Sequence, residues 1–367
     1  MPPFSPDEVR RRWAAVQHRM DEALDALVVV SFHGSYYLTG MPVMPLGRWA
    51  VTVLPRSGAP AVVAPRIDAE ALARDTPVPR VLGYDDTRPT IAAVAGLVAE
   101  TLRGTRVVGI EGMAMPVALR DALAALLPGV RFVDATAAFD GARLVSSGAE
   151  LELVVRAGAI AMAGMDAARA ALDAGGSEAS VTARLREVMT RLLPDDAPGE
   201  LLVIVQAGGR SATEAHRPST SAPLGDGLVQ VLCECGIWHY RAAVARCLPL
   251  GRVSDAEARA LEIADAAFAA ALAAVRPGAR CCDVDAAARA LLRDHGEVPT
   301  GAGFAYPLVH EHGGRSELAE LRPYNERPLE PGMILMLEPW AMVPGVGGPR
   351  RADMVRVGAR SAVPLTR

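Results

Sequence analysis

The chain has 367 residues, long enough for two domains that each bury a full core. About half of its residues (51%) are hydrophobic, yet no uninterrupted apolar run reaches the roughly 18 residues that a membrane span needs. The net charge of −4, without a clustered basic stretch, argues against nucleic acid as a main partner, and the absence of lysine excludes a lysine nucleophile or Schiff base.

The amino terminus, MPPFSPDEVRRRW, has no apolar segment after its charges, so we expect no export signal and a cytoplasmic location. All five cysteines lie in the second half of the chain and, without export, are expected to be reduced. Neither Cys233-Glu234-Cys235 nor Cys281-Cys282 has the spacing of a zinc site. We predict that most of these cysteines are small buried hydrophobic residues.

Helical and strand patterns alternate through the first part of the chain. Residues 6–24 have helical periodicity, and Ala26–Ser31 is a compact apolar strand. Trp49–Leu54 and Ala61–Ala64 are predicted to form a hairpin, because the turn residues Ser57-Gly58 lie between them. The next elements are a helix over Ile91–Leu102, a strand over Val107–Ile110, a helix over Pro116–Leu127 and a strand over Val130–Val133. This order predicts a small α/β domain with a mixed sheet.

A domain boundary is predicted at residues 143–148, before a long Ala-rich helix over Glu150–Leu172, for which Ser146 or Ser147 is a suitable N-cap. The later elements are helices over Glu178–Leu192, Asp255–Val275 and Cys282–Asp294 and strands over Leu201–Gln206 and Leu228–Glu234. No phosphate-binding glycine motif follows a predicted strand, so nucleotide binding has no support. The longest loop, residues 207–227, carries His216, and loops of this length usually contribute to a functional site or are flexible.

The stretch Leu329–Trp340, LEPGMILMLEPW, combines a turn, a strand and a carboxylate. Pro331-Gly332 predicts the turn, and Met333–Leu337 is an apolar run of strand length. Glu338 follows directly, and burying its carboxylate is costly unless it meets a cation, a metal or a substrate. From these residues alone, a site carboxylate and a solvent-exposed strand end are about equally supported.

Motifs on both sides of this stretch extend the pattern. His310-Glu311 lies upstream, and Gly347–Val355, GGPRRADMV, lies downstream. Near the amino terminus, Tyr37–Gly40 reads YLTG. This order and spacing resemble those of the pita-bread enzymes, the family of Xaa-Pro peptidases, methionine aminopeptidases and the non-metal enzyme creatinase.

The resemblance covers the whole chain and implies its fold. A creatinase-like amino-terminal α/β domain is expected over residues 1–145, followed by a pita-bread α+β domain over residues 146–367. The family also implies a homodimer, in which the small domain of one subunit lies near the pocket of the other. A small-molecule substrate is the expected partner.

Metal-dependent members of this family hold two divalent ions with two Asp, one His and two Glu. The resemblance places these ligands at Glu234, Ala243, Gly303, Glu338 and Ala352, provided that Arg246 closes the family's D-x-x-R motif. At most two carboxylates remain, so we predict no catalytic metal and no other cofactor. A single adventitious ion at Glu234 and Glu338 is the weaker alternative.

The hairpin predicted over Cys233–Arg246 resembles that of creatinase-like members, which use no metal, and Glu338–Gly345, EPWAMVPG, is similar to their E-P-x-x-M-x-P-G. His216 matches the histidine that serves creatinase as general acid and base. The guanidinium-binding glutamates of creatinase fall at Ala245 and Arg351, so the resemblance does not extend to creatine as substrate.

Two histidines fall on motif positions, and histidine is the side chain best suited to proton transfer near neutral pH. The predicted catalytic residues are His216, His310 and Glu338. The predicted substrate-binding residues are Glu234, His239, Tyr240, Trp340, Arg351 and His312. For each there is a plainer alternative: structural histidines, a tryptophan in the core, and a surface arginine on a hairpin. Arg351 at a normally acidic position indicates a substrate with a carboxylate.

The sequence favours a metal-independent, creatinase-like enzyme that acts on a C–N bond of a small metabolite by His/Glu acid–base catalysis. One alternative is an Xaa-Pro-type metallopeptidase with a degenerate metal site. Another is a catalytically silent binding protein on the same fold. A one-residue shift in register would turn Glu234 away from the pocket and bring Cys233 and Cys235 into it.

Overall fold

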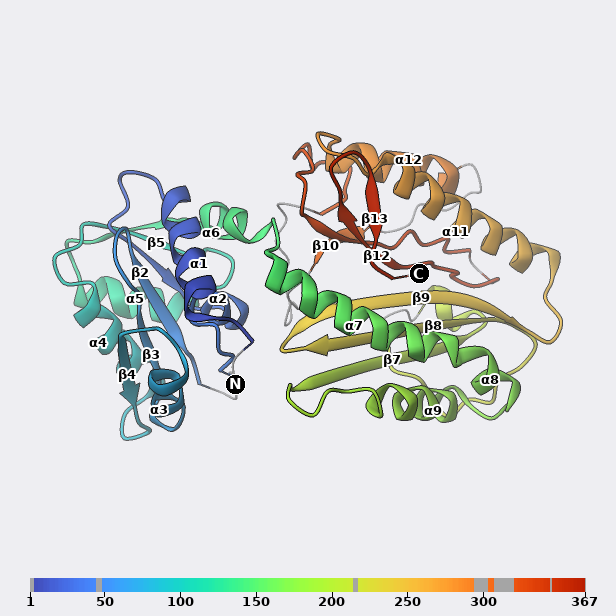
Figure 1. Ribbon diagram of the computed structural model, residues 1–367, viewed down its shortest axis with the longest axis horizontal. Helices are drawn as coiled ribbons and strands as arrows, with labels where there is room; N and C mark the ends of the chain where they lie inside the picture. The colour runs from blue at the N-terminus through green and yellow to red at the C-terminus, as the bar shows by residue number, and fades with distance from the viewer. Residues whose placement is uncertain are drawn as a thin grey trace. The chain divides into compact units, whose positions relative to one another are not determined.

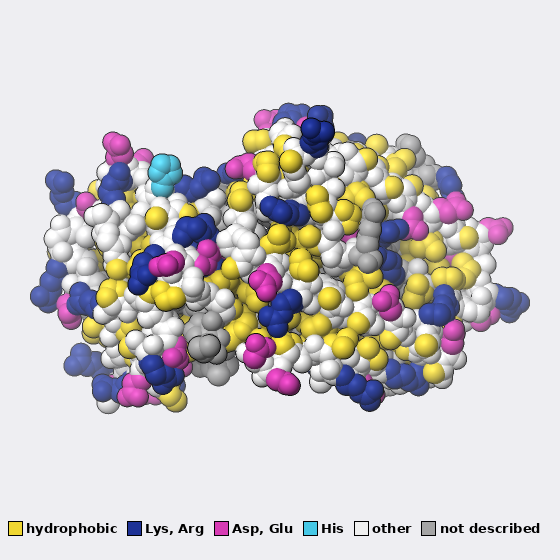
Figure 2. Space-filling model, in the orientation of Figure 1, with side chains coloured by type: hydrophobic (Ala, Val, Ile, Leu, Met, Phe, Trp, Pro, Cys, Tyr) yellow, Lys and Arg dark blue, Asp and Glu magenta, His cyan; other side chains and the backbone are white. Residues whose placement is uncertain are grey.

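The computed structural model describes residues 3–43, 48–213, 217–293, 320–343 and 345–366, together with the backbone of residues 303–306. These residues divide into two compact units, one ending at Arg143 and the other beginning at Leu144. No helix within these ranges is long and apolar enough to cross a membrane. On the visible face of the described residues, arginines and carboxylates are interspersed (Figure 2).

The first unit alternates helices and strands, as the sequence predicted (Figure 1). Its helices are α1 (Pro6–Arg19), α2 (Phe32–Thr39), α3 (Arg66–Asp75), α4 (Thr90–Thr101), α5 (Val117–Leu126) and α6 (Thr136–Arg143). Its strands are β1 (Ala26–Val29), β2 (Val51–Pro55), β3 (Ala61–Pro65), β4 (Arg80–Tyr84), β5 (Val107–Ile110) and β6 (Arg131–Asp134).

The described strands of this unit form a mixed sheet in the order β4-β3-β2-β1-β5-β6. Strand β2 is antiparallel to both of its neighbours, whereas β1–β5, β5–β6 and β3–β4 are parallel pairs. Helices α4 and α5 bury their apolar stripes against it, through Val94 and Leu119 packed with Val28 and Val53. The mixed α/β sheet predicted for this part of the chain is confirmed.

The second unit contains the remaining elements. Its helices are α7 (Gly148–Asp166), α8 (Ala168–Asp173), α9 (Glu178–Thr190), α10 (Arg210–Thr213), α11 (Asp255–Ala274) and α12 (Cys281–Arg293). Its strands are β7 (Gly199–Ala207), β8 (Gly227–Ile237), β9 (Tyr240–Leu250), β10 (Gly303–Tyr306), β11 (Ile334–Leu337), β12 (Asp353–Val357) and β13 (Ala362–Pro364).

Two antiparallel sheets meet in this unit. Strands β7-β8-β9 form one, and β10-β11-β12-β13 form the other. Ala245 of β9 and Ala352 join them, because each backbone N–H donates to the other residue's carbonyl at 3.1 and 3.0 Å. The strands on either side of this bridge therefore present one continuous surface.

Helices cover one face of this surface. In Figure 1, α7 lies across β8 and β9, and α9 runs beside β7. Helices α11 and α12 form a core with the second sheet, to which Leu335, Leu337, Val355 and Val357 contribute. These are alternate residues of β11 and β12, so the residues between them point to the opposite face.

The boundary helix differs from its prediction at one end. Ser147 is the N-cap of α7, and with Glu150 it forms a capping box, which settles the choice between Ser146 and Ser147. The single helix predicted over Glu150–Leu172 is wrong, because the chain ends α7 at Asp166 and begins α8 at Ala168. Neither proline nor glycine marks this break, so the local pattern does not show it.

Candidate active site

The β8–β9 hairpin supplies the first part of the site. Its two-residue turn, Trp238-His239, has φ of 50° and 61°, the left-handed conformation that such a tight hairpin requires. The turn fixes the register so that Glu234 lies opposite Ala243. Because cross-strand partners point to the same face, these two residues share a face, and Cys233 and Cys235 share the other.

Close packing with α7 identifies the helix-covered face. A Cβ atom on Gly164 would lie 3.2 Å from Cys233 Sγ, and one on Gly158 would lie 3.6 Å from Ala242 Cβ. Cys233 and Ala242 therefore point toward α7, and Glu234 points away from it, to the face of the sheet that α7 does not cover, which we call the open face. This register places Glu234 on the face opposite to Cys233 and Cys235.

Tyr240 belongs to the helix-covered face, not to the predicted pocket. Its side chain is fully buried, and its hydroxyl donates to Glu150 Oε1 of α7 at 2.9 Å. The sequence grouped Tyr240 with His239 because both lie on the predicted hairpin, but His239 belongs to its turn, and Tyr240 lies on the same face of β9 as Ala242. The structure therefore supports a packing role for Tyr240 in place of the predicted contact with substrate.

A cluster of charges lies beside Glu234. Arg241 donates from Nη1 to Glu234 Oε1 at 2.6 Å and pairs through Nη2 with Glu200. His239 Nδ1 lies 2.5 Å from Glu200 Oε1. The hydrogen bond from His239 and the charge of Arg241 lower the pKa of Glu200, against the effect of its partial burial. Gly236 gives Arg241 room, because a Cβ there would lie 3.0 Å from Arg241 Cγ.

Glu338 lies at the start of the second part of the site. It follows β11, whose last residue, Leu337, pairs with Asp353. Glu338 therefore continues the ladder beside Ala352, the residue that bridges to Ala245. Both alanines are fully buried, and the Glu338 side chain is only 11% exposed. The predicted site carboxylate is thus on the open face of the sheet, next to the junction of the two sheets.

Arg350 is the cation that meets Glu338. Its Nη1 lies 3.1 Å from Glu338 Oε1, and its guanidinium carbon is 5.0 Å from the centre of the Trp340 ring. The side chain is 4% exposed, and among the described residues its Nε has no hydrogen-bond partner. The Trp340 indole donates to Gly348 O at 2.6 Å, and Gln230 accepts from the Arg350 backbone at 2.9 Å.

Arg351, the predicted carboxylate-binding residue, lies on the helix side. Its guanidinium is 3.2 Å from Asp265 of α11, 3.5 Å from Asp353 and 4.6 Å from the centre of the Phe268 ring. It alternates with Ala352, which points to the open face. This placement does not fit the predicted role of Arg351, and Arg350 is the arginine beside Glu338.

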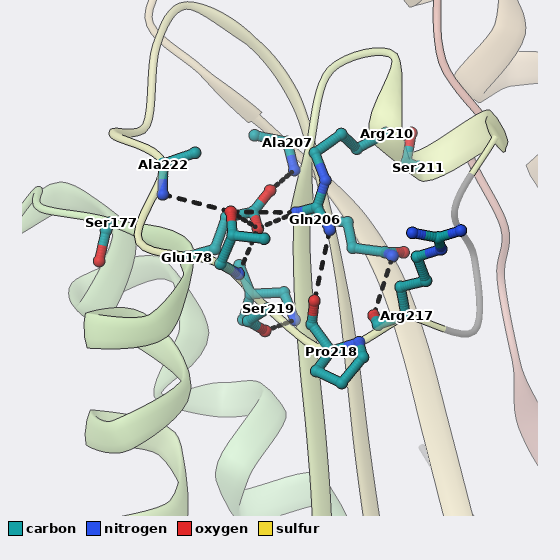
Figure 3. A network of polar contacts seen from close by, with 12 residues as sticks. Ser177, Glu178, Gln206, Ala207, Arg210, Ser211, Arg217, Pro218, Ser219 and Ala222 are labelled. Atoms are coloured by element: carbon teal, nitrogen blue, oxygen red, sulfur yellow. Dashed lines mark hydrogen bonds and ion pairs between the residues drawn. The ribbon is translucent and has the colours of Figure 1, made fainter.

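A buried carboxylate binds described residues at both ends of the segment between β7 and β8 (Figure 3). Glu178, at the start of α9, accepts hydrogen bonds from Ala207 N at 2.9 Å and from Thr220 N and Oγ1 at 2.8 and 2.9 Å. Arg210 forms an ion pair with the same carboxylate. Burial alone would raise the pKa of Glu178, but these donors outweigh it and lower the pKa.

The same loop also contacts the segment after Glu338. Gly348 N donates to Ser211 Oγ at 2.8 Å, and Ser211 Oγ donates to Gly208 O at 2.7 Å. A Cβ on Gly348 would lie 2.5 Å from Ser211 O, so only glycine permits this approach. On the other side of the loop, Gln206 Nε2 donates to Arg217 O at 3.2 Å.

Three of the predicted residues, His216, His310 and His312, lie outside the described residues. Of the others, Glu234, His239, Glu338 and Trp340 belong to the two charged groups above. Several site residues were missed from the sequence: Glu178, Arg210, Gln230, Arg241 and Arg350. Only Arg350 carried a local signal, as one of two adjacent arginines in a motif, and nothing local distinguished it from Arg351.

Comparisons with known proteins identify the family. The sequence-family model of the creatinase/prolidase N-terminal domain matches residues 12–145, and the family model of metallopeptidase family M24 matches residues 152–359. The chain belongs to metallopeptidase family M24. The predicted resemblance and the predicted fold, a creatinase-type amino-terminal domain followed by a pita-bread domain, are confirmed, and the chain is an M24-type hydrolase by family.

Individual M24 members resemble the chain along nearly its full length. Creatinase from Bacillus sp. (strain B-0618) is 28% identical over 100% of this chain and 92% of its own. Agropine synthesis cyclase from Rhizobium rhizogenes is 27% identical over 98% of this chain and 96% of its own. The crystal structure of dipeptidase PepE from Mycobacterium ulcerans has a TM-score of 0.82 at 28% identity, covering 99% of this chain and 97% of that one.

The residues at the positions that the resemblance assigned to metal ligands do not fit a dinuclear centre. Ala243 and Ala352 have no donor atoms in their side chains, and Gly303, which pairs with Leu337 in β10–β11, has no side chain. The two carboxylates, Glu234 and Glu338, are each ion-paired with an arginine. Within the ranges that the structure describes, no three His, Cys, Asp or Glu gather in a way that could hold a metal ion.

Proposed function

We propose that this chain is a metal-independent enzyme of the creatinase type, acting on an amide, amidine or guanidine C–N bond of a small, carboxylate-bearing metabolite. One observation carries the proposal: both carboxylates left at the family's metal positions hold a guanidinium, Glu234 that of Arg241 and Glu338 that of Arg350. A divalent cation would have to displace both arginines and would gain only two of five ligands.

In the proposed hydrolysis, the imidazole of His216 takes a proton from water as the water oxygen bonds to the carbon of the C–N bond. The C–N bond then breaks, and the imidazolium returns the proton to the departing nitrogen. One water is consumed and nothing is oxidised or reduced. His310 and Glu338 are proposed to hydrogen-bond the reacting group, Glu338 being held in place by Arg350. Elimination across the same bond would use the same proton acceptor.

Arg350, in place of the predicted Arg351, is proposed to bind the substrate carboxylate. It lies on the open face of the sheet beside Glu338, and arginine matches carboxylates with two parallel N–H donors. Its buried Nε, which lacks a partner among the described residues, provides a donor for this contact. Trp340, under the guanidinium, fixes the plane in which the carboxylate would bind.

Metal analysis tests this proposal directly. Purified protein would be incubated with Mn²⁺ and Co²⁺, desalted, analysed for metal, and assayed with small amides, guanidines, amino-acid derivatives and dipeptides. We expect turnover that survives chelator and is lost in His216→Ala and His310→Ala. His18→Ala, at an exposed position of α1, is the matched control and should retain full activity.

The opposite outcomes identify the alternatives. Stoichiometric metal together with dipeptide cleavage that a chelator abolishes would overturn the proposal and indicate a metallopeptidase with an altered site. Binding of a small carboxylate without turnover, unchanged when His216 and His310 are both alanine, would indicate a binding protein.

We also propose that the chain forms a homodimer, as the family resemblance implies. Sedimentation velocity over a hundredfold range of protein concentration would test this. A single species with the mass of one chain throughout that range would contradict it.

A further inference from the structure

Gln230 carries a buried amide in the middle of an apolar strand. It lies on β8, four residues before Glu234 and therefore on the same open face of the sheet, and it is 2% exposed. Apart from these two residues, the strand consists of apolar side chains and glycine. Burying an amide is costly unless its oxygen and its nitrogen both find partners. The partners of the amide therefore explain why a glutamine occupies this position.

The amide of Gln230 joins three segments of the chain. Its Oε1 accepts from Arg350 N at 2.9 Å, and its Nε2 donates to Arg246 O at 3.1 Å and to Val231 O at 3.3 Å. Because a backbone N–H can only donate and a carbonyl can only accept, these partners fix the orientation of the amide. The side chain thereby connects β8 and β9 to the segment that follows Glu338.

The backbone N–H of Arg350 depends on this contact. Arg350 and Trp340 lie opposite each other in an antiparallel bridge, in which Ala341 N donates to Pro349 O at 2.9 Å. Since that hydrogen bond joins the neighbours of the pair, the N–H of Arg350 points away from Trp340. Gln230 is the acceptor that it meets there. An apolar side chain in place of Gln230 would leave this buried N–H without an acceptor.

Fixing the backbone of Arg350 also fixes the place of its guanidinium. Nη1 lies 3.1 Å from Glu338 Oε1, and the guanidinium carbon lies 5.0 Å from the centre of the Trp340 ring. The side chain is 4% exposed, and among the described residues its Nε has no hydrogen-bond partner. If the Cα of Arg350 moved, the side chain would have to rotate and lose one of these contacts. The guanidinium is therefore held from its backbone as well as by Glu338 and Trp340.

We propose that Gln230 is a positioning residue for Arg350, and that it sets the affinity of the site for a carboxylate without contacting the substrate itself. Because Nη1 pairs with Glu338, the guanidinium is left with the edge formed by Nε and Nη2, whose N–H groups are parallel and match the two oxygens of a carboxylate. Two parallel hydrogen bonds require this edge to be held at a fixed place and angle. The inference rests on the proposed role of Arg350 in binding the substrate carboxylate.

Two substitutions test this in the full-length protein with acetate as the probe. Gln230→Met keeps the size of the side chain and removes both hydrogen-bonding groups, whereas Gln230→Asn keeps an amide that is one methylene too short. Binding is followed in isotopically labelled protein by the NMR signals of Arg350 Nε–H, assigned from Arg350→Lys, and of the Trp340 indole, assigned from Trp340→Phe. We expect the dissociation constant for acetate to rise about tenfold in both variants, because the buried N–H loses its acceptor. Acetamide, which has no charge, should move neither signal.

Three further measurements show whether Gln230 acts through Arg350. Exchange of the Arg350 Nε proton with water should become about tenfold faster in Gln230→Met, since the guanidinium is no longer held in one place. In an Arg350→Lys background, Gln230→Met should change the acetate affinity by less than about twofold. With a substrate in hand, KM should rise about tenfold in Gln230→Met while kcat changes by less than about twofold.

A matched control separates positioning from general support of the fold. Tyr240→Phe also removes a buried hydrogen bond from the β8–β9 hairpin, but on the helix-covered face, where the hydroxyl meets Glu150. It should lower Tm and leave both the acetate affinity and the exchange of the Arg350 Nε proton as in the wild type. If Tyr240→Phe and Gln230→Met weaken acetate binding equally, Gln230 only stabilises the fold and the inference falls.

Failure of this inference is distinguishable from failure of the proposed function. If Arg350→Lys weakens acetate binding while both Gln230 variants bind acetate as the wild type does, the carboxylate role of Arg350 stands and the positioning role falls. If the wild type does not bind acetate, the carboxylate role fails, and proton exchange tests the positioning by itself. Faster exchange of the Arg350 Nε proton in Gln230→Met, but not in Tyr240→Phe, supports it. Unchanged exchange in Gln230→Met overturns it.

Discussion

The two faces of the β8–β9 hairpin are built from alternate residues of the same strands, yet they obey different rules. On the helix-covered face, Cys233 and Cys235 are buried against α7, and burial raises the pKa of both thiols to about 12. On the open face, Glu234 and Arg241 meet at 2.6 Å within a cluster of charges. Substitutions on the helix-covered face are restricted by the space available, and those on the open face by the need to keep opposite charges paired.

This difference between the two faces indicates which substitutions each face can accept. A methyl group added to the helix face must displace packed atoms, because protein interiors have few voids. A charge removed from the open face leaves its partner buried and uncompensated. Substitutions on the two faces should therefore fail in different ways, and the following predictions run from the largest expected effect to the smallest.

The largest effect is expected at the Glu338–Arg350 pair. Glu338→Ala leaves the buried guanidinium unpaired and should lower the free energy of unfolding by about 3–5 kcal/mol in urea titrations. The double variant Glu338→Leu/Arg350→Met should recover most of this loss. The exposed pair Glu100–Arg80 is the control, since Glu100→Gln should cost less than about 1 kcal/mol. Equal losses at the two pairs would contradict a buried ion pair.

On the helix face, Gly164→Ala should destabilise by about 1–3 kcal/mol, because the new methyl would lie 2.6 Å from Met189 Sδ and 3.2 Å from Cys233 Sγ. Gly96 provides the comparison, as it is exposed within α4 with nothing within 4 Å of a Cβ. Gly96→Ala should stabilise by about 0.5–1 kcal/mol, since alanine is the better helix former. Thermal and urea unfolding of both variants would show the contrast; a stabilised Gly164→Ala would refute it.

Tyr240→Phe probes the polar contact within the helix face. Loss of the hydroxyl removes the 2.9 Å hydrogen bond to the buried Glu150 and should cost about 1–2 kcal/mol of unfolding free energy. Because Tyr240 points toward α7, we expect substrate turnover to be unchanged. A lower kcat together with an unaltered unfolding free energy would support a role for Tyr240 in the active site.

The smallest effect is expected at Glu200, whose pKa is lowered in the folded protein by His239 and Arg241. Its contribution to stability is fully present above its unfolded pKa, near 4.5, and is lost as pH falls through the lowered folded value. Wild type and Glu200→Gln should differ by less than about 1 kcal/mol at pH 7, because the side chain is a third exposed. The difference should vanish in acid; a gap that widened below pH 4 would contradict this sign.

Much of the fold was predictable because its signals are local. The strand over residues 107–110 was predicted with its observed ends, and the helix starting at Asp255 begins where Ser254 caps it. Apolar periodicity and capping residues act within one or two turns, so they can be recognised without knowing what they pack against. The break at Ala167 has no such signal and was missed.

The site was predictable only where a motif carried it. Glu338 was singled out by its place after an apolar strand, and Glu234 by its place in the hairpin. Their ion pairs with Arg350 and Arg241 were not predicted, although both arginines lie in the motifs that the sequence analysis used. Arg351 was assigned to the pocket because it stands at a normally acidic position of the family, and Tyr240 because it lies on the predicted hairpin. Neither reason fixes the face of the sheet to which the side chain points, because side chains alternate between the two faces along a strand.

What the sequence by itself determined is the M24 order of elements and the absence of metal-binding side chains at Ala243, Gly303 and Ala352, because both are facts of residue identity along the chain. Only the tertiary structure decided that Glu234 points away from α7, that Arg350 and not Arg351 pairs with Glu338, and that Glu178 binds both Ala207 and Thr220. These depend on strand register and on contacts between residues more than ten positions apart, and no local pattern specifies either.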